Sequence, residues 1–207
     1  RGGACSADGN IDSKTFSLTR GIENVDPEKD KIVVGGNAVK KKQGKAVTVA
    51  LYKPKGYLST RADTRSRKTV MDLLPKELQY LKPVGRLDYE SEGLILLSSD
   101  GEFILQSTHP RYQKEKEYRL VFKGSVPDRL LTRFEKGIRL PEGLAKADRV
   151  ERIDKNEIAV VIHQGWNRQL RRMAEACRAD VAKLIRIRSG DIKLENLKPG
   201  EWRKVKM

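Results

Sequence analysis

Continuous and alternating apolar runs predict a series of short strands from about residue 45 onward. The segments 46–52 (AVTVALY) and 93–98 (GLILLS) are almost wholly apolar, which is typical of strands buried on both faces. Residues 157–164 are predicted to pair with 150–153 through the turn 154–156. Further strands are predicted at 31–34, 117–122, 183–188 and 191–194.

Helical spacing of apolar residues predicts helices between these strands. Pro127 suits a first helical turn, and it is followed at helical spacing by Leu130, Leu131 and Phe134. A second helix is predicted to begin at the N-cap Asn167 and to place Leu170, Met173, Ala174 and Cys177 on one face. Short helices are also expected at 70–74 and at 102–108, with Phe103, Ile104 and Leu105 facing inward.

These elements do not alternate regularly as strand, helix, strand. The pattern therefore predicts an α+β fold with a mixed, largely antiparallel sheet flanked by helices. Residues 1–44 are weakly patterned and end in a lysine-rich stretch, so we expect an N-terminal segment over 1–44 and a folded domain over 45–207.

The excess of positive charge indicates that the protein binds a polyanion. Lys and Arg total 43 and Asp and Glu total 28 among 207 residues, a net charge of +15. The cations concentrate in 40–68 and 163–188. Lysine runs are also common on solvated faces, and both interpretations stay open for 40–45. Arginine clusters favour recognition of phosphate, which points to nucleic acid.

Composition also excludes several classes of protein. No stretch approaches the roughly 20 apolar residues of a membrane helix, and the N-terminus lacks the pattern of a secretory signal. Cys5 and Cys177 cannot form a disulfide framework, so a reducing compartment is expected. Neither these cysteines nor His109 and His163 have the spacing of metal ligands.

Candidate chemistry lies in Gly85-Arg86-Leu87-Asp88, just before the buried strand 93–98. A carboxylate can act as a nucleophile when a nearby cation keeps it ionised in a desolvated site. Asp88 is therefore the candidate nucleophile. A purely structural role, as an ion pair with Arg86 or a turn cap, is the alternative from these residues alone.

Five collinear motifs within 46–205 resemble pseudouridine synthases of the RsuA type, which modify ribosomal RNA. Residues 85–101 (GRLDYESEGLILLSSDG) resemble the family pattern GRLDxxTxGLLLxTxDG, with Ser91 in place of Thr. The other motifs are KPKGY with ST (53–60), EKEY (115–118), QGWNRQLRRM (164–173) and LIRIRSG with LKPGEW (184–202). Departures from the family are Gln164 for Glu, Trp166 for Arg or Lys, and the absence of Asn before Lys53.

The resemblance implies that Asp88 attacks a flipped-out uridine, at C6 of the base or at C1′ of the ribose. The base then rotates and C5 joins C1′, and no metal or cofactor is required. It further implies that Arg171 pairs with Asp88, Tyr118 stacks on the uracil and assists proton removal from C5, and Leu170 lines the other side. Substrate contacts are expected from Arg86, Leu170, Asn167, Arg168, Arg172 and Lys55.

Within the family, the motifs at 167–173 and 186–188 resemble the large-subunit enzymes more than the small-subunit one. The expected partner is therefore ribosomal RNA or a pre-ribosomal particle, bound without membrane or small-molecule cofactor by a monomer. Residues 25–34 resemble the end of an S4 RNA-binding domain, which predicts a truncated or diverged S4-like segment. The bacterial cytoplasm is the expected compartment, with an organelle matrix as the alternative. A non-catalytic RNA-binding assembly factor that retains the fold is the alternative function.

Overall fold

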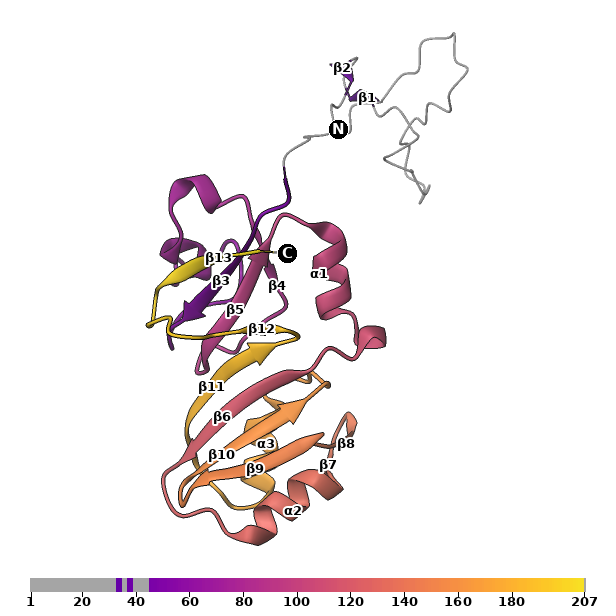
Figure 1. Cartoon of the computed structure of the whole chain (residues 1–207), viewed down its shortest axis with the longest axis vertical. Coiled ribbons are helices and arrows are strands. Elements are labelled where there is room, and N and C mark those ends of the chain that lie inside the picture. Colours follow the sequence, from indigo (N-terminus) through magenta and orange to yellow (C-terminus); the bar gives the residue numbers. More distant parts are fainter. Residues whose placement is uncertain (1–32, 35–36, 39–44, 207) are drawn as a thin grey trace. The chain divides into compact units, whose positions relative to one another are not determined.

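The computed structural model describes residues 33–34, 37–38 and 45–206 (Figure 1). Contacts divide the chain into two units, Arg1–Lys45 and Ala46–Met207. In the first unit, β1 (Val33–Val34) pairs antiparallel with β2 (Asn37–Ala38), in agreement with a strand at 31–34. The rest of the predicted S4-like segment lies outside the described residues.

A nine-stranded sheet organises the second unit. Its order is β13-β3-β5-β11-β6-β10-β9, with β4 paired to β5 and β12 to β11 (Figure 1). Every neighbouring pair is antiparallel except β5 with β11, so the predicted mixed, largely antiparallel sheet is confirmed. The strands are β3 (Thr48–Lys53), β4 (Lys82–Val84), β5 (Glu92–Ser98), β6 (Lys116–Phe122), β9 (Arg149–Asp154), β10 (Glu157–Ile162), β11 (Val181–Ser189), β12 (Ile192–Lys193) and β13 (Trp202–Val205).

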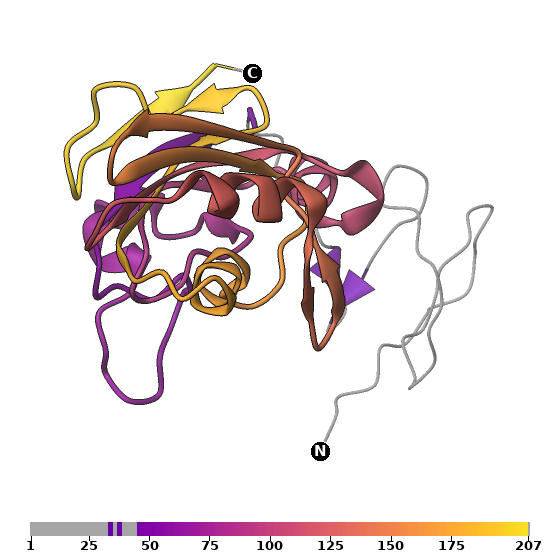
Figure 2. The same ribbon diagram turned by 90° about the horizontal axis from the view of Figure 1, so that it is seen from below.

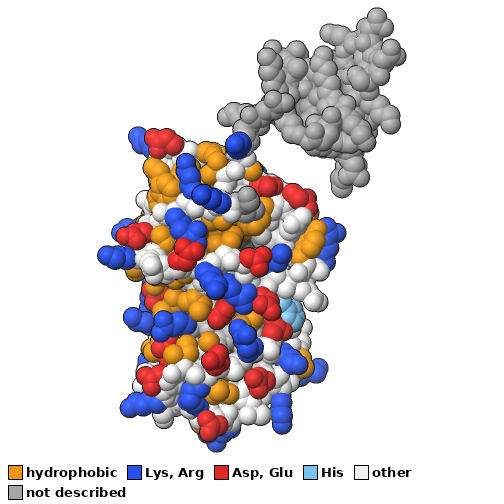
Figure 3. Space-filling model, viewed as in Figure 1, with side chains coloured by type: hydrophobic (Ala, Val, Ile, Leu, Met, Phe, Trp, Pro, Cys, Tyr) orange, Lys and Arg blue, Asp and Glu red, His pale blue; other side chains and the backbone are white. Residues whose placement is uncertain are grey.

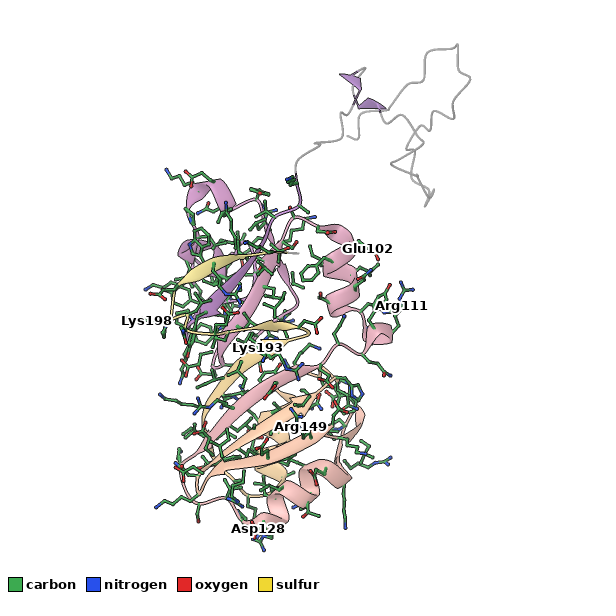
Figure 4. The ribbon with its side chains drawn as sticks, viewed as in Figure 1. Glu102, Arg111, Asp128, Arg149, Lys193 and Lys198 are labelled. Atoms are coloured by element: carbon green, nitrogen blue, oxygen red, sulfur yellow. The ribbon has the colours of Figure 1, made fainter. Side chains whose placement is uncertain are left out.

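Helices and one further hairpin connect these strands. Asp128 is the first residue of α2, and Glu102 lies in the first turn of α1 (Figure 4). A carboxylate in the first turn stabilises a helix, because it interacts with the positive end of the helix dipole. The helices are α1 (Gly101–Thr108), α2 (Asp128–Lys136) and α3 (Gln169–Ala176), with 3₁₀ turns η1 (Val70–Leu73), η2 (Lys76–Leu78) and η3 (Pro110–Tyr112) and the hairpin β7 (Ile138–Leu140) with β8 (Gly143–Ala145). No helix in this part of the chain is both long and apolar enough to cross a membrane.

The half of the sheet formed by β6, β9 and β10 is covered on one face by helices. Alternate residues of β6 and β10 point to this face, and they pack with side chains of α2 and α3. Figure 2 shows α3 as the light-orange coil beneath the strands. The cluster includes Leu120, Phe122, Ile158, Val160, Leu130, Phe134 and Met173.

The strands β3 and β5 are buried on both faces, which explains their continuous apolar sequences. Val49, Leu51 and Ile95 pack against the 3₁₀ segment after residue 69, and Leu94 packs on the opposite side. Leu105 was expected to face inward, but it is 40% exposed, so this prediction is wrong. Phe103 and Ile104 pack against the core, but the next residue along a helix is rotated by about 100° and points away.

The face of the second unit visible in Figure 3 carries Lys and Arg side chains interspersed with Asp and Glu. Some of the sequence's cations are engaged in ion pairs. Arg188 binds Glu117 and Glu115, each at 2.9 Å, and Arg172 pairs with Glu142 at 2.8 Å. The basic run 163–188 therefore does not act as one free surface, because some of its charge is neutralised within the protein.

Candidate active site

The loop between β4 and β5 fixes the backbone of the predicted nucleophile. Gly85 has a φ of +74°, a conformation that side chains disfavour. Leu87 is buried, and its N–H and C=O both bond to the hydroxyl of Ser59, at 3.1 and 2.7 Å. Ser91 N–H donates to the Asp88 carbonyl at 3.0 Å. The loop is therefore tied down on both sides of Asp88.

Asp88 lines a cavity of about 330 Å³ that also contains most of the predicted site residues. Tyr118 from β6 and Leu170 from α3 form part of its wall and are 8% and 3% exposed. Arg86, Asn167 and Arg168 also line it. Among the described residues, none donates a hydrogen bond to the half-buried Asp88 carboxylate. Such a carboxylate is available to react with a ligand.

A buried lysine lies behind this loop. Lys53 has no exposed surface, and its Nζ donates to the carbonyls of Ser91 at 2.8 Å and Pro54 at 3.0 Å. The pKa of Lys53 is lowered to about 8, chiefly by burial and also by the nearby Arg186 cation, while the negative charge of Asp88 partly opposes this shift. Lys53 therefore places a titratable positive charge near Asp88.

A second buried cation, Arg186 of β11, joins the same loop to the centre of the sheet. It is 3% exposed, and its guanidinium donates to the carbonyls of Leu94 at 2.7 Å and Arg86 at 3.3 Å. Burial, and then the charge of Arg186, lowers the pKa of Lys116, which also lines the cavity. Arg186 thus faces the interior of the site and not solvent-exposed phosphates.

Arg171 supports the loop from the side of α3. Its guanidinium donates to the carbonyls of Glu90 at 2.9 Å and Val181 at 3.3 Å. Burial and the neighbouring Arg168 lower the pKa of Arg171, whereas the negative charge of Asp88 acts in the opposite direction. Within the described residues, Arg171 makes no direct ion pair with Asp88. Its catalytic pairing remains a prediction.

The start of α3 differs from its prediction. Arg168, with a left-handed φ of 49°, is the N-cap instead of Asn167. No side chain caps the first turn of α3. The Gln169 side chain instead holds the preceding turn, because it accepts from the Trp166 N–H at 3.2 Å and donates to Gln164 at 2.8 Å. This tight turn places Trp166, Asn167 and Arg168 on the cavity wall.

Lys55 and Arg172 lie away from the cavity and are engaged with carboxylates. Lys55 pairs with Glu90 at 2.7 Å, and its side chain is 63% exposed. Arg172 binds Glu142 through two hydrogen bonds of 2.9 and 2.8 Å. Their predicted substrate contacts stay predictions, and both would first have to exchange these partners.

A second cavity of about 530 Å³ meets the first at the same loop. The two share Arg86, Leu87, Asp88, Asn167 and Arg168. The site is therefore a pair of adjoining cavities, and Asp88 lines both of them.

Sequence patterns missed Lys53, Arg186, Lys116 and the cavity role of Trp166. Lys53 begins the KPKGY motif, but it lies at the end of an apolar strand, where a lysine side chain is expected to reach solvent, so the sequence does not indicate its burial. Within residues 45–206, no group of three His, Cys, Asp or Glu side chains is arranged to share a metal ion.

Comparison with known proteins agrees with the motif resemblance. A family model described as RNA pseudouridylate synthase matches residues 47–176. The ribosomal large subunit pseudouridine synthase B of Bacillus subtilis is 40% identical over 182 residues, which cover 85% of this chain and 74% of the relative. An uncharacterized RNA pseudouridine synthase of Aquifex aeolicus is 36% identical over 186 residues, 87% of this chain and 74% of the relative.

A solved structure supports the same relationship. The crystal structure of a pseudouridylate synthase superposes with a TM-score of 0.73 and 28% identity, covering 78% of this chain and 71% of the other. Half or more of the chain matches the family model, and the relatives align over most of their length. The predicted membership is confirmed: the chain belongs to the RNA pseudouridylate synthase family.

Proposed function

We propose that this protein isomerises a specific uridine of large-subunit ribosomal RNA to pseudouridine, with Asp88 as the nucleophile. The observation that carries the proposal is the Asp88 carboxylate, which lies without a hydrogen-bond partner among the described residues in a cavity walled by Tyr118 and Leu170. The substrate is inferred from relatives named ribosomal large subunit pseudouridine synthase B.

The reaction requires the target nucleotide to leave its base stack, because the glycosidic carbon is otherwise inaccessible. Asp88 adds to C6 of the uracil or to C1′ of the ribose, and the C1′–N1 bond breaks. The base rotates, C5 bonds to C1′, and the Asp88 ester or adduct is released as the C5 proton is lost. Because product and substrate are isomers, the balance needs no oxidant, reductant or group donor.

The wall residues suit this sequence of steps. Tyr118 and Leu170 are buried at the cavity and offer an aromatic and an aliphatic surface to a flat base. Arg86, Arg168 and Asn167 are exposed and line both cavities, which supports assigning them to the phosphates and the ribose of the substrate. Lys55 and Arg172 are assigned to the surrounding RNA backbone.

The proposal is tested with transcripts of large- and small-subunit ribosomal RNA that carry tritium at C5 of uridine. Joining C5 to C1′ releases that tritium, so counts in solution measure the reaction. We expect release from the large-subunit transcript, either free or assembled with ribosomal proteins. RNA binding without tritium release from any of these substrates would instead support the non-catalytic assembly factor.

Replacement of Tyr118 by Phe keeps the ring and removes the hydroxyl. If that hydroxyl assists removal of the C5 proton, kcat falls about 100-fold while KM changes little. Single-turnover tritium release at saturating enzyme measures the effect. A kcat equal to that of the wild type would limit Tyr118 to stacking.

The lowered pKa of Lys53 predicts that the reaction slows at alkaline pH. Its pKa of about 8 means that rising pH removes a positive charge near Asp88. We expect kcat/KM to fall above about pH 8 in the wild type. The Lys53→Met variant, neutral at every pH, is expected to be about tenfold slower at pH 7 and flat up to pH 9, where the two curves converge. If kcat/KM of the variant fell with pH in parallel with that of the wild type, a group other than Lys53 would cause the alkaline decline.

The catalytic domain is assigned to 45–207 and a monomer is the expected functional unit. The bacterial cytoplasm, where ribosomal RNA is transcribed and assembled, is the proposed compartment, with an organelle matrix as the alternative.

A further inference from the structure

The second cavity has a large exposed aromatic on its wall. Tyr89 directly follows the nucleophile in sequence, lines this cavity and is 45% exposed. Its backbone is nevertheless fixed, because its carbonyl accepts from the Gly56 N–H at 2.9 Å. Exposing an aromatic ring on an anchored backbone offers a ready stacking surface, since little ordering is needed when a ligand binds.

The opposite side of this cavity is a loop that is held in one shape. Asp63 accepts from the backbone N–H groups of Arg65 and Arg67, at 3.0 and 3.1 Å. It also binds the Arg67 guanidinium through two further contacts of 3.2 and 2.7 Å. Ser59, at the start of the loop, bonds to Leu87 next to the nucleophile. The cavity is therefore built by two segments that are tied to each other.

Charge favours an anionic occupant. The two acidic side chains on this wall apart from Asp88 are Asp63 and Glu90, which pair with Arg67 and Lys55. Arg86 and Arg168 are exposed at the junction of the two cavities and make no ion pair within the described residues. An aromatic surface beside such free guanidinium groups is the combination that binds single-stranded nucleic acid.

We propose that this second cavity binds the nucleotide next to the target uridine, with its base stacked on Tyr89 and the linking phosphate between Arg86 and Arg168. The inference rests on the proposed function. If the first cavity holds the flipped uridine at Asp88, the covalently attached neighbour must lie one phosphodiester link away, and the second cavity opens at the same residue. Tyr89 thus selects a neighbour that is unpaired and free to stack.

The test combines a protein change with an RNA change. The protein variants are Tyr89→Ala, Tyr89→Phe and, as a matched control, Tyr80→Ala, since Tyr80 is 51% exposed and lines neither cavity. The substrates are a large-subunit fragment containing the modified uridine and two versions with an abasic residue on its 5′ or 3′ side. Single-turnover tritium release gives kcat/KM for each combination.

Loss of one stacked base is expected to lower kcat/KM about 5- to 100-fold. Tyr89→Ala should show this loss on the intact fragment, and the wild type should show it on one of the two abasic fragments. Tyr89→Ala acting on that abasic fragment should lose no more kcat/KM than either change causes alone. Tyr89→Phe should recover most of the loss, and Tyr80→Ala should stay within about twofold of the wild type.

Two outcomes overturn the inference while leaving the proposed function intact. One is a Tyr89→Ala variant that forms pseudouridine as fast as the wild type. The other is an effect of Tyr89→Ala that persists in full on both abasic fragments. If the wild type modifies no transcript, the proposed function fails, and the Kd for the large-subunit transcript decides instead. Equal Kd values for Tyr89→Ala and Tyr80→Ala would then exclude stacking.

Discussion

Asp88→Asn is expected to lower the rate of pseudouridine formation at least about 1,000-fold, because the amide cannot form the covalent bond that begins the reaction. The fold should tolerate the change, since the two side chains have the same shape and no described residue donates a hydrogen bond to the Asp88 carboxylate. RNA binding should persist or tighten slightly, because a negative charge is removed from the site. Tritium release and a filter-binding Kd measure the two effects separately.

Asp128→Asn is the matched control for this experiment. Asp128 is an exposed carboxylate at the start of α2, where it pairs with Arg152 at 2.7 Å, and it lines neither cavity. Its substitution should leave tritium release within about twofold of the wild type. A variant lacking the Asp88 carboxylate that still reacts at the wild-type rate would refute the assignment of the nucleophile.

Gly93→Ala is expected to destabilise the protein by about 3 kcal/mol or more. Gly93 has a φ of +104°, and a Cβ there would lie 2.3 Å from the carbonyl oxygen and 2.7 Å from the nitrogen of Arg186. Both atoms are backbone, in the strand pair that joins Arg186 to Gly93. They cannot move without opening the junction of β5 and β11, so the Arg186 contacts to the nucleophile loop should weaken as well.

Urea unfolding of the wild type and of two alanine variants measures this effect. Gly101 is the control, because its added Cβ would meet no atom within 4 Å and it begins a helix, where alanine is tolerated. Gly101→Ala should therefore be as stable as the wild type or slightly more so. A Gly93→Ala protein with an unchanged unfolding midpoint and activity would show that the two strands can separate at no cost.

Long apolar or alternating segments were predictable, whereas short pairings were not. The apolar run 93–98 predicted a strand correctly, because both faces of β5 are covered by other side chains. The alternation at 117–122 also predicted a strand correctly, because only one face of β6 packs in the core. The strands β4, β7, β8 and β13 contain only three or four residues each. β4 pairs with the nearby β5, β7 pairs with β8 in a short hairpin, and β13 pairs with the distant β3. Segments this short contain too few residues for a periodicity to mark them as strands.

The candidate site shows the same division. The motifs located Asp88, Tyr118 and Leu170, and the structure brings all three to one cavity. Sequence could not place Lys53 or Arg186 there, because a buried cation is recognised only from the carbonyls and charges that surround it. The N-cap of α3 was misplaced because Arg168 adopts a left-handed φ and no side chain caps the helix, which the residue types do not indicate.

The order of strands has a consequence for how the enzyme is made. β11 is inserted between β5 and β6, and β13 pairs with β3, so late residues complete a sheet begun more than a hundred residues earlier. During synthesis, a nascent chain that has not yet exposed 181–205 lacks Arg186 beneath the nucleophile loop and has an open edge at β3. Each molecule should therefore become active only after its C-terminal strands leave the ribosome, and delayed release would hold it in an aggregation-prone state.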